Sequence, residues 1–340
     1  MSWFAIESLK RIEIGITSYC NARCPLCPRQ KFFSYDEDPK VHHMHLEKQK
    51  LFSLLPSFSK STDLSVEFIG GFGDPILHPD LLEVCEEYLK SSNIRIVLET
   101  NGGVRNLEFW KSLGELSKRT GRLIVRFSID GLSDTNHIYR AQTQFDKIIT
   151  KATHYIENGG EAQWKFICFE HNQHQHEEAK TMAEELGFKK FILHHTSRWM
   201  AAEHPIKGTS HILRPSDEAK KNIEKMKYMS EDSSNFRCKS LDQKSLFINF
   251  RFELWPCCYF SIEKEKYERW NTYWEKITDM YGNGFNDLSK VSLSEMLEHP
   301  YFQKIIPESW SSKENYTSVC GKFCGGKVYW DSDKKSKPLG

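Results

Sequence analysis

The sequence has almost no excess of charge of either sign. Its 340 residues include 47 Lys and Arg against 46 Asp and Glu, which leaves a formal net charge of +1. Because such a chain creates no long-range field that would attract a polyanion, we expect no nucleic-acid partner. No run approaches the roughly 20 apolar residues that span a bilayer, and charge follows the N-terminus too soon for a secretory signal. We therefore expect a cytoplasmic protein with no membrane partner.

Cysteine, by contrast, is plentiful. In a secreted chain ten cysteines would suggest disulfides, whereas without an export signal the thiols stay reduced and available as ligands. Cys85 and Cys168 fall within a predicted helix and a predicted strand, where we expect them to be buried. The others form a tight N-terminal group and a looser C-terminal group: Cys20, Cys24 and Cys27, then Cys238, Cys257, Cys258, Cys320 and Cys324.

Short apolar runs alternate with amphipathic segments along the first 200 residues. The segments 79–91, 145–158 and 176–186 have helical periodicity, and each strand-helix unit spans about 32 residues, the size of a βαβ unit. This pattern predicts an α/β fold with a partial (β/α)6 TIM-like barrel and its chemistry at the C-terminal strand ends. The predicted strands are 11–16, 64–69, 94–98, 123–128, 164–169 and 191–195.

The alternation stops after residue 199, which predicts a change of domain. We assign residues 1–200 to the barrel and the polar residues 201–235 to a linker. Residues 236–330, with cysteine-containing loops, are predicted to form a smaller second domain. Residues 331–340 have no apolar face and are predicted to be a disordered tail.

Three cysteines lie within eight residues directly after the first predicted strand. Cys20, Cys24 and Cys27 have the spacing Cx3Cx2C. Three thiolates can hold three corners of a 4Fe–4S cluster, and no fourth cysteine lies nearby, so the last iron is open to a ligand. The alternatives are a zinc site completed by a nearby histidine, or unliganded core thiols.

This loop resembles the signature of the radical S-adenosylmethionine (SAM) superfamily. The resemblance implies that the open iron chelates SAM, and that electron transfer from the cluster cleaves SAM to methionine and a 5′-deoxyadenosyl radical, which abstracts a substrate hydrogen. It also implies an external electron donor such as flavodoxin or ferredoxin. Leu26 is a departure, because the family usually has an aromatic residue there.

Three further motifs follow predicted strands in the superfamily's order. Residues 70–75 (GGFGDP) resemble a GGE-type motif that receives the SAM ammonium group, residues 99–102 read ETNG, and residues 128–131 read SIDG. In similar enzymes the serine of SIDG binds the ribose, and an arginine twelve residues later pairs with the SAM carboxylate through its planar fork. The resemblance implies cofactor binding by Gly71, Gly73, Asp74, Asn101, Ser128, Asp130 and Arg140.

The C-terminal cysteines resemble the twitch-type form of the SPASM domain, a small α+β domain that holds one auxiliary 4Fe–4S cluster. By this resemblance its ligands are Cys238, Cys257, Cys320 and Cys324, and the chain holds two 4Fe–4S clusters in all. Cys258, next to Cys257, is the alternative ligand. A zinc ion in the same thiolates is the alternative occupant.

The end of the sixth predicted strand should face the substrate. We select His195 and Arg198 there as the candidate residues for substrate contact. Proteins with this two-part arrangement modify peptides or proteins, or oxidise small molecules. An auxiliary cluster can accept an electron from the substrate, which favours oxidation. We expect an oxidoreductase or maturase acting on a peptide or protein; the alternatives are a sugar- or aminocyclitol-like dehydrogenase and, more remotely, a zinc-stapled binding module without catalysis.

Overall fold

The structure is a computed structural model that describes residues 3–196, 202–229, 237–267, 272–311 and 317–324. Six parallel strands lie side by side in chain order, which confirms the predicted α/β arrangement. Alternate strand residues such as Ile12 and Ile14 are buried, as expected where one sheet face packs on helices. The strands are β1 (Arg11–Ile14), β2 (Leu64–Phe68), β3 (Ile94–Thr100), β4 (Leu123–Ser128), β5 (Glu161–Ile167) and β6 (Lys190–His194).

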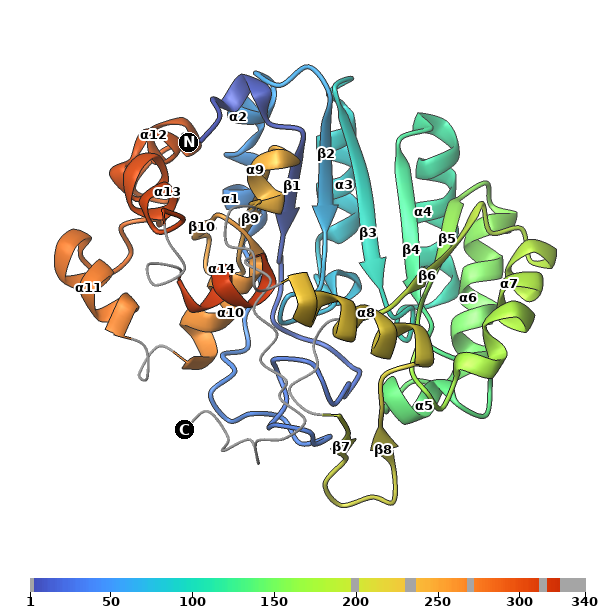
Figure 1. Ribbon diagram of the computed structural model, residues 1–340. Helices are drawn as coiled ribbons and strands as arrows, with labels where there is room; N and C mark the ends of the chain where they lie inside the picture. Colours follow the sequence, from blue (N-terminus) through green and yellow to red (C-terminus); the bar gives the residue numbers. More distant parts are fainter. Residues whose placement is uncertain (1–2, 197–201, 230–236, 268–271, 312–316, 325–340) are drawn as a thin grey trace.

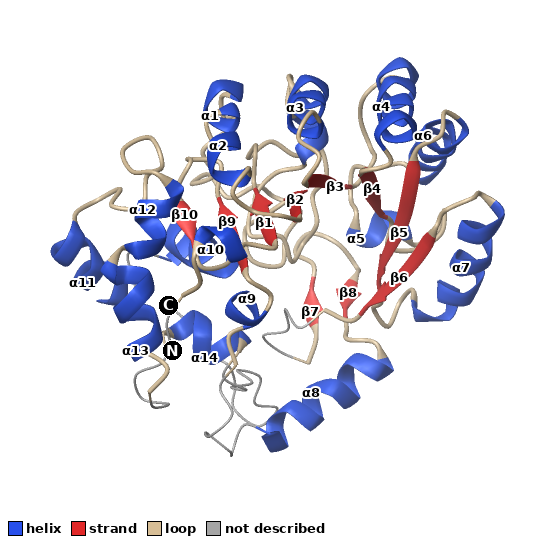
Figure 2. Ribbon diagram, turned by 90° about the horizontal axis from the view of Figure 1, so that it is seen from above, coloured by secondary structure: helices blue, strands red, loops and turns tan. Residues whose placement is uncertain are grey.

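Helices cover the outer side of this sheet. Figure 2 shows the strands in an arc, with most of the connecting helices along its convex side, as in an open barrel. The three helices predicted by periodicity are present, and β5 begins three residues before its predicted start. The connecting helices are α1 (Lys48–Phe52), α2 (Leu55–Phe58), α3 (Leu81–Leu89), α4 (Leu107–Thr120), α5 (Asn136–Tyr139), α6 (Phe145–Glu157) and α7 (His176–Glu185).

Helix α4 was not predicted, although its ends follow standard rules. The Asn106 side chain accepts a hydrogen bond from the Phe109 amide at the N-terminus, and Gly121 is left-handed (φ 64°) after the last turn. Three short 3-10 helices complete this part of the chain: Ile6–Ser8, Pro75–Leu77 and Gln173–Gln175.

The C-terminal part of the chain joins the same sheet. Strand β9 (Ser245–Ile248) pairs with β1 in parallel, and β10 (Leu254–Trp255) pairs with β9 in antiparallel, so the sheet has eight strands. One hydrophobic core runs from the barrel strands into this region. Its helices are α9 (Lys239–Asp242), α10 (Cys258–Tyr267), α11 (Thr272–Tyr281), α12 (Leu293–Glu298), a π-helical turn (Tyr301–Ile305), α13 (Ile306–Glu308) and α14 (Ser318–Phe323). The predicted domain boundaries remain predictions.

The segment predicted as a linker lies over the C-terminal ends of the strands. It contains a small hairpin of β7 (His204–Pro205) and β8 (Ile212–Leu213), followed by α8 (Asp217–Met229), which crosses in front of the sheet in Figure 1. Apolar side chains from this segment form a second buried cluster with the cysteine loop: Ile206, Leu213 and Ile223 pack with Ala22 and Cys24. This segment therefore covers the loop after β1.

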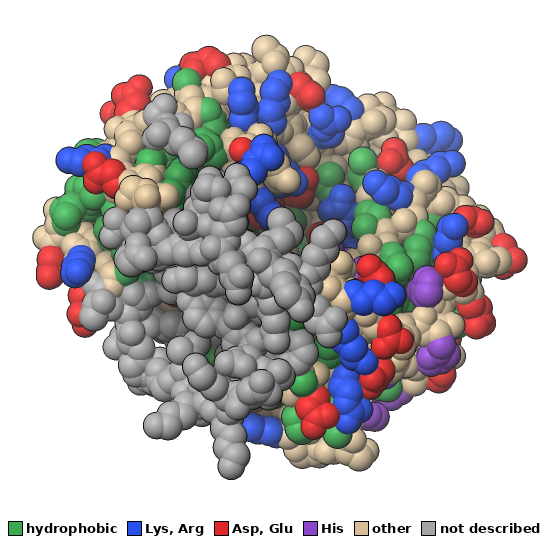
Figure 3. Space-filling model, in the orientation of Figure 1, with side chains coloured by type: hydrophobic (Ala, Val, Ile, Leu, Met, Phe, Trp, Pro, Cys, Tyr) green, Lys and Arg blue, Asp and Glu red, His purple; other side chains and the backbone are tan. Residues whose placement is uncertain are grey.

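The visible surface carries charges of both signs. On the face shown in Figure 3, acidic and basic side chains are interspersed over the right-hand part, in keeping with the balanced composition. Among the described residues, no helix combines the length and the apolar character needed to cross a bilayer.

Candidate active site

The loop after β1 brings its three cysteines into one partly enclosed environment. Cys24 is buried, and Cys20 and Cys27 are half-buried. Burial raises the pKa of Cys20, and the charges of Asp74, Cys24 and Cys27 raise it further. Burial also raises the pKa of Cys24 to about 11, against the opposing charge of Arg140. Raised pKa values at Cys20 and Cys24 suit a site that gains bound cations, because metal ions stabilise thiolates.

A cluster and a single metal ion would make different demands on these three thiols. Across the described ranges, no group of three or more His, Cys, Asp or Glu side chains converges on a single-ion site. Zinc draws each thiolate sulfur to about 2.3 Å and so brings its ligands close together. A 4Fe–4S cluster instead takes one cysteine at each of several separate irons, so its ligands stand farther apart.

A buried arginine supports the same loop. Arg29 Nη1 donates to the carbonyl oxygen of Cys20 at 3.1 Å, and Arg29 Nη2 pairs with Glu37 at 3.1 Å. Glu37 also pairs with Arg23 at 2.8 Å. Sequence reasoning missed this network, because an arginine two residues after the last cysteine has no pattern that separates it from a surface residue.

The loop after β2 packs directly against the cysteine loop. A Cβ atom on Gly73 would lie 2.2 Å from the carbonyl oxygen of Thr17, so only glycine permits this approach. The carboxylate of Asp74 accepts hydrogen bonds from the amides of Ile76 (3.1 Å) and Asn101 (2.7 Å). The predicted cofactor residue Asp74 thus fastens the loop after β2 to the end of β3.

The end of β3 also reaches the cysteine loop. Asn101 Nδ2 donates to Asn21 Oδ1 at 3.0 Å and lies 3.7 Å from the sulfur of Cys20.

In the loop after β2, Gly71 is less enclosed than Gly73, since a Cβ atom on Gly71 would have Phe247 Cζ as its nearest neighbour, at 3.3 Å. The motifs after β2 and β3 therefore surround the predicted cluster ligand Cys20.

The SIDG motif after β4 positions the predicted carboxylate-binding arginine. Arg140 Nε donates to Asp130 Oδ2 at 2.5 Å, and Arg140 Nη1 lies 3.6 Å from Cys24 Sγ. Asp130 is fully buried, and its other oxygen accepts from the Ile167 amide at 2.6 Å. Burial raises the pKa of Asp130, and the charge of Arg140 opposes this. Ser128 is buried at the end of β4.

Of the two predicted substrate residues, only His195 belongs to the described part. Its Nδ1 lies 2.9 Å from Ser216 Oγ, which also accepts a hydrogen bond from the Ala219 amide at the start of α8. Burial lowers the pKa of His195. Arg198 lies outside the described residues. Substrate contact by either residue remains a prediction.

A row of charged side chains lies on the inner face of the sheet, opposite the helices. Glu99 pairs with Lys165 at 2.5 Å and with Arg126 at 3.3 Å. Glu13 and Glu67 stand opposite each other on β1 and β2. Burial raises the pKa of Glu13 to about 7, and the charge of Glu67 adds to this effect. Sequence reasoning missed this row, although charges alternate with apolar residues in these strands, which indicates one polar face.

The C-terminal cysteines gather from three helices. Cys238 precedes α9, Cys257 precedes α10, and Cys320 and Cys324 lie on or just after α14. Burial raises the pKa of Cys320 to about 12, and the charges of Cys238 and Cys324 contribute. Burial also raises the pKa of Cys257, with contributions from Cys258 and Cys320. The four predicted ligands are therefore electrostatic neighbours.

Two polar groups hold Cys320. The buried Trp310 donates its Nε1–H to Cys320 Sγ at 3.4 Å. Thr317 caps α14 by accepting from the Cys320 amide at 3.0 Å. A fixed donor at the sulfur suits a thiolate, because a hydrogen bond to the charged form favours that form.

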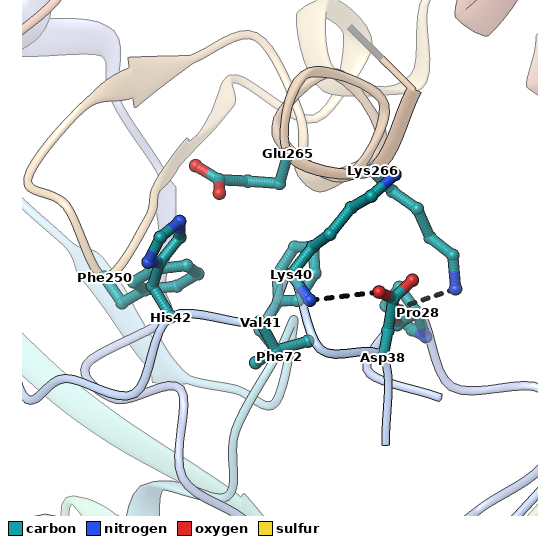
Figure 4. Close-up of a pocket in the computed structure, with 9 residues that line it drawn as sticks. All are labelled: Pro28, Asp38, Lys40, Val41, His42, Phe72, Phe250, Glu265 and Lys266. Atoms are coloured by element: carbon teal, nitrogen blue, oxygen red, sulfur yellow. Dashed lines mark hydrogen bonds between the residues drawn. The ribbon is translucent and has the colours of Figure 1, made fainter. Parts of the chain in front are cut away.

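A small hollow lies between the cysteine loop and the C-terminal part. Figure 4 shows Phe72 and Phe250 on one side, with Glu265 and Lys266 of α10 above them. The two rings pack edge to face, with centroids 5.6 Å apart. Since Phe72 belongs to the GGFGDP motif, the hollow adjoins the predicted cofactor site.

The family model described as the radical SAM superfamily matches residues 14–186, which include the cysteine loop and all the cofactor motifs. The chain belongs to the radical SAM superfamily. Members of this family bind SAM and a 4Fe–4S cluster and catalyse radical reactions. The matched range contains the three cysteines after β1 and the motifs at the ends of β2, β3 and β4, whose individual roles remain predictions.

Solved structures share the fold of this radical SAM protein. anSMEcpe with bound AdoMet and the Cp18Cys peptide superposes with a TM-score of 0.55 at 16% identity, covering 87% of this chain and 82% of that one. Streptococcus suis SuiB bound to precursor peptide SuiA superposes with a TM-score of 0.52 at 14% identity, covering 80% of this chain and 67% of that one. At such low identities the likeness concerns the fold.

A curated relative matches part of the sequence. The tungsten-containing aldehyde ferredoxin oxidoreductase cofactor-modifying protein of Pyrococcus furiosus is 28% identical over 130 residues, or 38% of this chain. The match spans 33% of that protein's length. A match of this extent says nothing of the substrate of this radical SAM protein.

Proposed function

We propose that this radical SAM enzyme oxidatively modifies a peptide or protein substrate with the help of an auxiliary 4Fe–4S cluster. The observation that carries the proposal is the gathering of Cys238, Cys257, Cys320 and Cys324 at a second site in the C-terminal part. An auxiliary cluster provides an acceptor for the electron that leaves an oxidised substrate. An external donor of the flavodoxin or ferredoxin class would reduce the cluster held by the N-terminal cysteines.

The residues around the N-terminal cysteines fit the binding of SAM. When bound, the reduced cluster and SAM together supply the radical that abstracts a substrate hydrogen. Arg140, fixed by Asp130 and directed at Cys24, offers its guanidinium to the carboxylate of SAM. The tight backbone of the loop after β2, close to the cysteine loop at Gly73, suits the ammonium group.

The segment that contains β7, β8 and the start of α8 shields the predicted SAM site from water. Ile206, Leu213 and Ile223 pack over Ala22 and Cys24 and so close the outer side of the cysteine loop. Excluding water limits side reactions of reactive intermediates. This arrangement supports a radical reaction in a closed site.

The peptide substrate is supported by the fold shared with anSMEcpe and SuiB, which were solved with peptides bound. A small polar substrate such as a sugar or aminocyclitol is the second candidate. The charged row formed by Glu99, Lys165 and Arg126 on the inner face favours it, because such groups bind hydroxyl and amino groups.

The first experiment is anaerobic reconstitution of the full chain. The proposal predicts about eight irons per chain and reductive cleavage of SAM to 5′-deoxyadenosine. Cleavage should fall to background in the Cys24→Ala variant and persist in the matched Cys85→Ala variant, whose thiol is buried in α3. Zinc without iron, or SAM cleavage that survives in Cys24→Ala, would contradict the assignment.

The second experiment separates the two substrate classes. Deuterated peptides and deuterated cyclitols are offered to the reconstituted enzyme, and deuterium transfer into 5′-deoxyadenosine is measured by mass spectrometry. Transfer from peptides is the expected result. Transfer from the cyclitols with none from any peptide would replace the proposed substrate class with the second candidate.

A further inference from the structure

Lys266, near the C-terminal end of α10, reaches across to the backbone that follows the radical-SAM cysteines. Its ammonium donates to the carbonyl oxygens of Pro28 at 2.9 Å and Gln30 at 2.6 Å. Figure 4 shows this side chain extending from the helix to Pro28. Pro28 directly follows Cys27, so the contact joins the C-terminal part to the cluster loop.

The ammonium of Lys266 is held in a confined position. It lies 4.7 Å from the centroid of the Phe32 ring, and the side chain is half-buried. Burial lowers the pKa of Lys266, while the charges of Asp38 and Cys27 act in the opposite direction. Two carbonyl acceptors and an aromatic face fix the cation beside Cys27. In such a poorly hydrated place its field is screened less than at the surface.

Helix α10 itself is anchored near its C-terminal end. Glu265, one residue before Lys266, forms a two-point ion pair with Arg251 at 2.6 and 3.1 Å. At its other end, α10 starts at Cys258, directly after the predicted auxiliary ligand Cys257. A helical rise of 1.5 Å per residue separates Cys258 from Lys266 by about 12 Å. One short helix therefore connects the two cysteine sites.

We propose that the charge of Lys266 raises the reduction potential of the SAM-binding cluster. Reduction adds one negative charge to the cluster, and a fixed cation beside Cys27 stabilises the reduced form more than the oxidised form. Net charge and exposure are known determinants of cluster potentials. The electron comes from the external donor, so Lys266 governs how readily that donor reduces the enzyme.

Helix α10 also sets the distance between the two clusters in this proposal. That second element rests on the proposed auxiliary cluster, whereas the effect of Lys266 on the SAM-binding cluster does not. An iron content near four per chain in the native protein would therefore show that the chain holds no auxiliary cluster. The inference about Lys266 would still stand.

The test is an EPR-monitored redox titration of the reconstituted full chain. Lys266→Met removes the cation and its hydrogen bonds, and Lys266→Gln keeps a neutral donor. Both variants should shift the midpoint potential of the SAM-binding cluster to more negative values. The matched control is Lys264→Met on the same helix, whose ammonium lies 5.7 Å from the Trp274 ring centroid, and it should keep the native potential.

Iron content and thermal unfolding of each variant show whether the site is intact. A native potential in Lys266→Met and Lys266→Gln, with native iron content, would overturn the proposal. An equal shift in Lys264→Met would also overturn it, because the effect would then follow any loss of charge from α10.

Discussion

Arg140 is held by Asp130 so that its guanidinium faces Cys24. The Nε atom of Arg140 lies 2.5 Å from Asp130 Oδ2, and Nη1 lies 3.6 Å from the Cys24 sulfur. Both carboxylate oxygens of Asp130 are engaged by groups of the protein itself. In the described structure, therefore, the acid of the SIDG motif positions the arginine.

Substituting Arg140 should weaken SAM binding. Arg140→Lys keeps the charge and loses the planar fork, and the loss of about 1.5–3 kcal/mol predicts roughly 10- to 100-fold weaker binding. The measurement is isothermal titration of SAM into the anaerobically reconstituted protein. Arg95→Lys is the control, because Arg95 is exposed and pairs with Asp63 away from this site. An unchanged SAM affinity in Arg140→Lys would show that the arginine does not bind the carboxylate.

The auxiliary site should be separable from SAM cleavage. Cys320→Ala is expected to lose about four irons and to form no product, while still cleaving SAM in the absence of substrate, because the loop after β1 is untouched. Iron analysis and chromatography of 5′-deoxyadenosine and product test this. Cys258→Ala is the companion variant: native iron content would identify Cys257 as the ligand, whereas loss of iron would assign the role to Cys258.

Protonation of Glu13 should make stability depend on pH. Its pKa is raised to about 7 by burial, with the charges of Glu67 and Glu99 adding to the effect. Between the ordinary pKa of 4.5 and about 7 the folded state binds more protons than the unfolded state, so stability falls as the pH rises and is level above that range.

The Glu13→Gln variant should lose this dependence. At pH 8 we expect it to be more stable than the native protein by on the order of 2 kcal/mol, with little difference near pH 4.5. Thermal unfolding across this range measures the effect. Glu108→Gln, at an exposed position in α4, should give a curve parallel to that of the native protein. A parallel curve for Glu13→Gln would refute the prediction.

A methyl group at residue 73 should disturb the cluster loop. The Cβ of Gly73→Ala would lie 2.2 Å from the Thr17 carbonyl oxygen, so the backbone must shift, and we expect a loss of about 3 kcal/mol together with poor iron retention. Unfolding and iron content are measured together. Gly15→Ala is the matched control, because its Cβ would meet Phe247 at an ordinary 3.6 Å. Equal behaviour of the two variants would contradict the expected crowding at Gly73.

Most of the barrel could be predicted because its signals are local. Apolar runs marked the six strands, and facing apolar residues marked α3, α6 and α7. Helix α4 was missed, even though Asn106 and Gly121 mark its ends, because polar residues outnumber apolar ones between them. The Cx3Cx2C spacing pointed to the family, since all three predicted ligands lie within one short segment.

The sequence by itself determined the order of the strands, the three cysteines predicted to hold the SAM-binding cluster and the family to which they point. Only the tertiary structure decided how distant residues meet: β9 pairs with β1, Asp130 holds Arg140, and Lys266 reaches Pro28 from 238 residues away. Local patterns arise from neighbours along the chain, and a sequence displays them directly. Contacts between remote segments depend on which side chains the folded sheet and helices direct toward the same place.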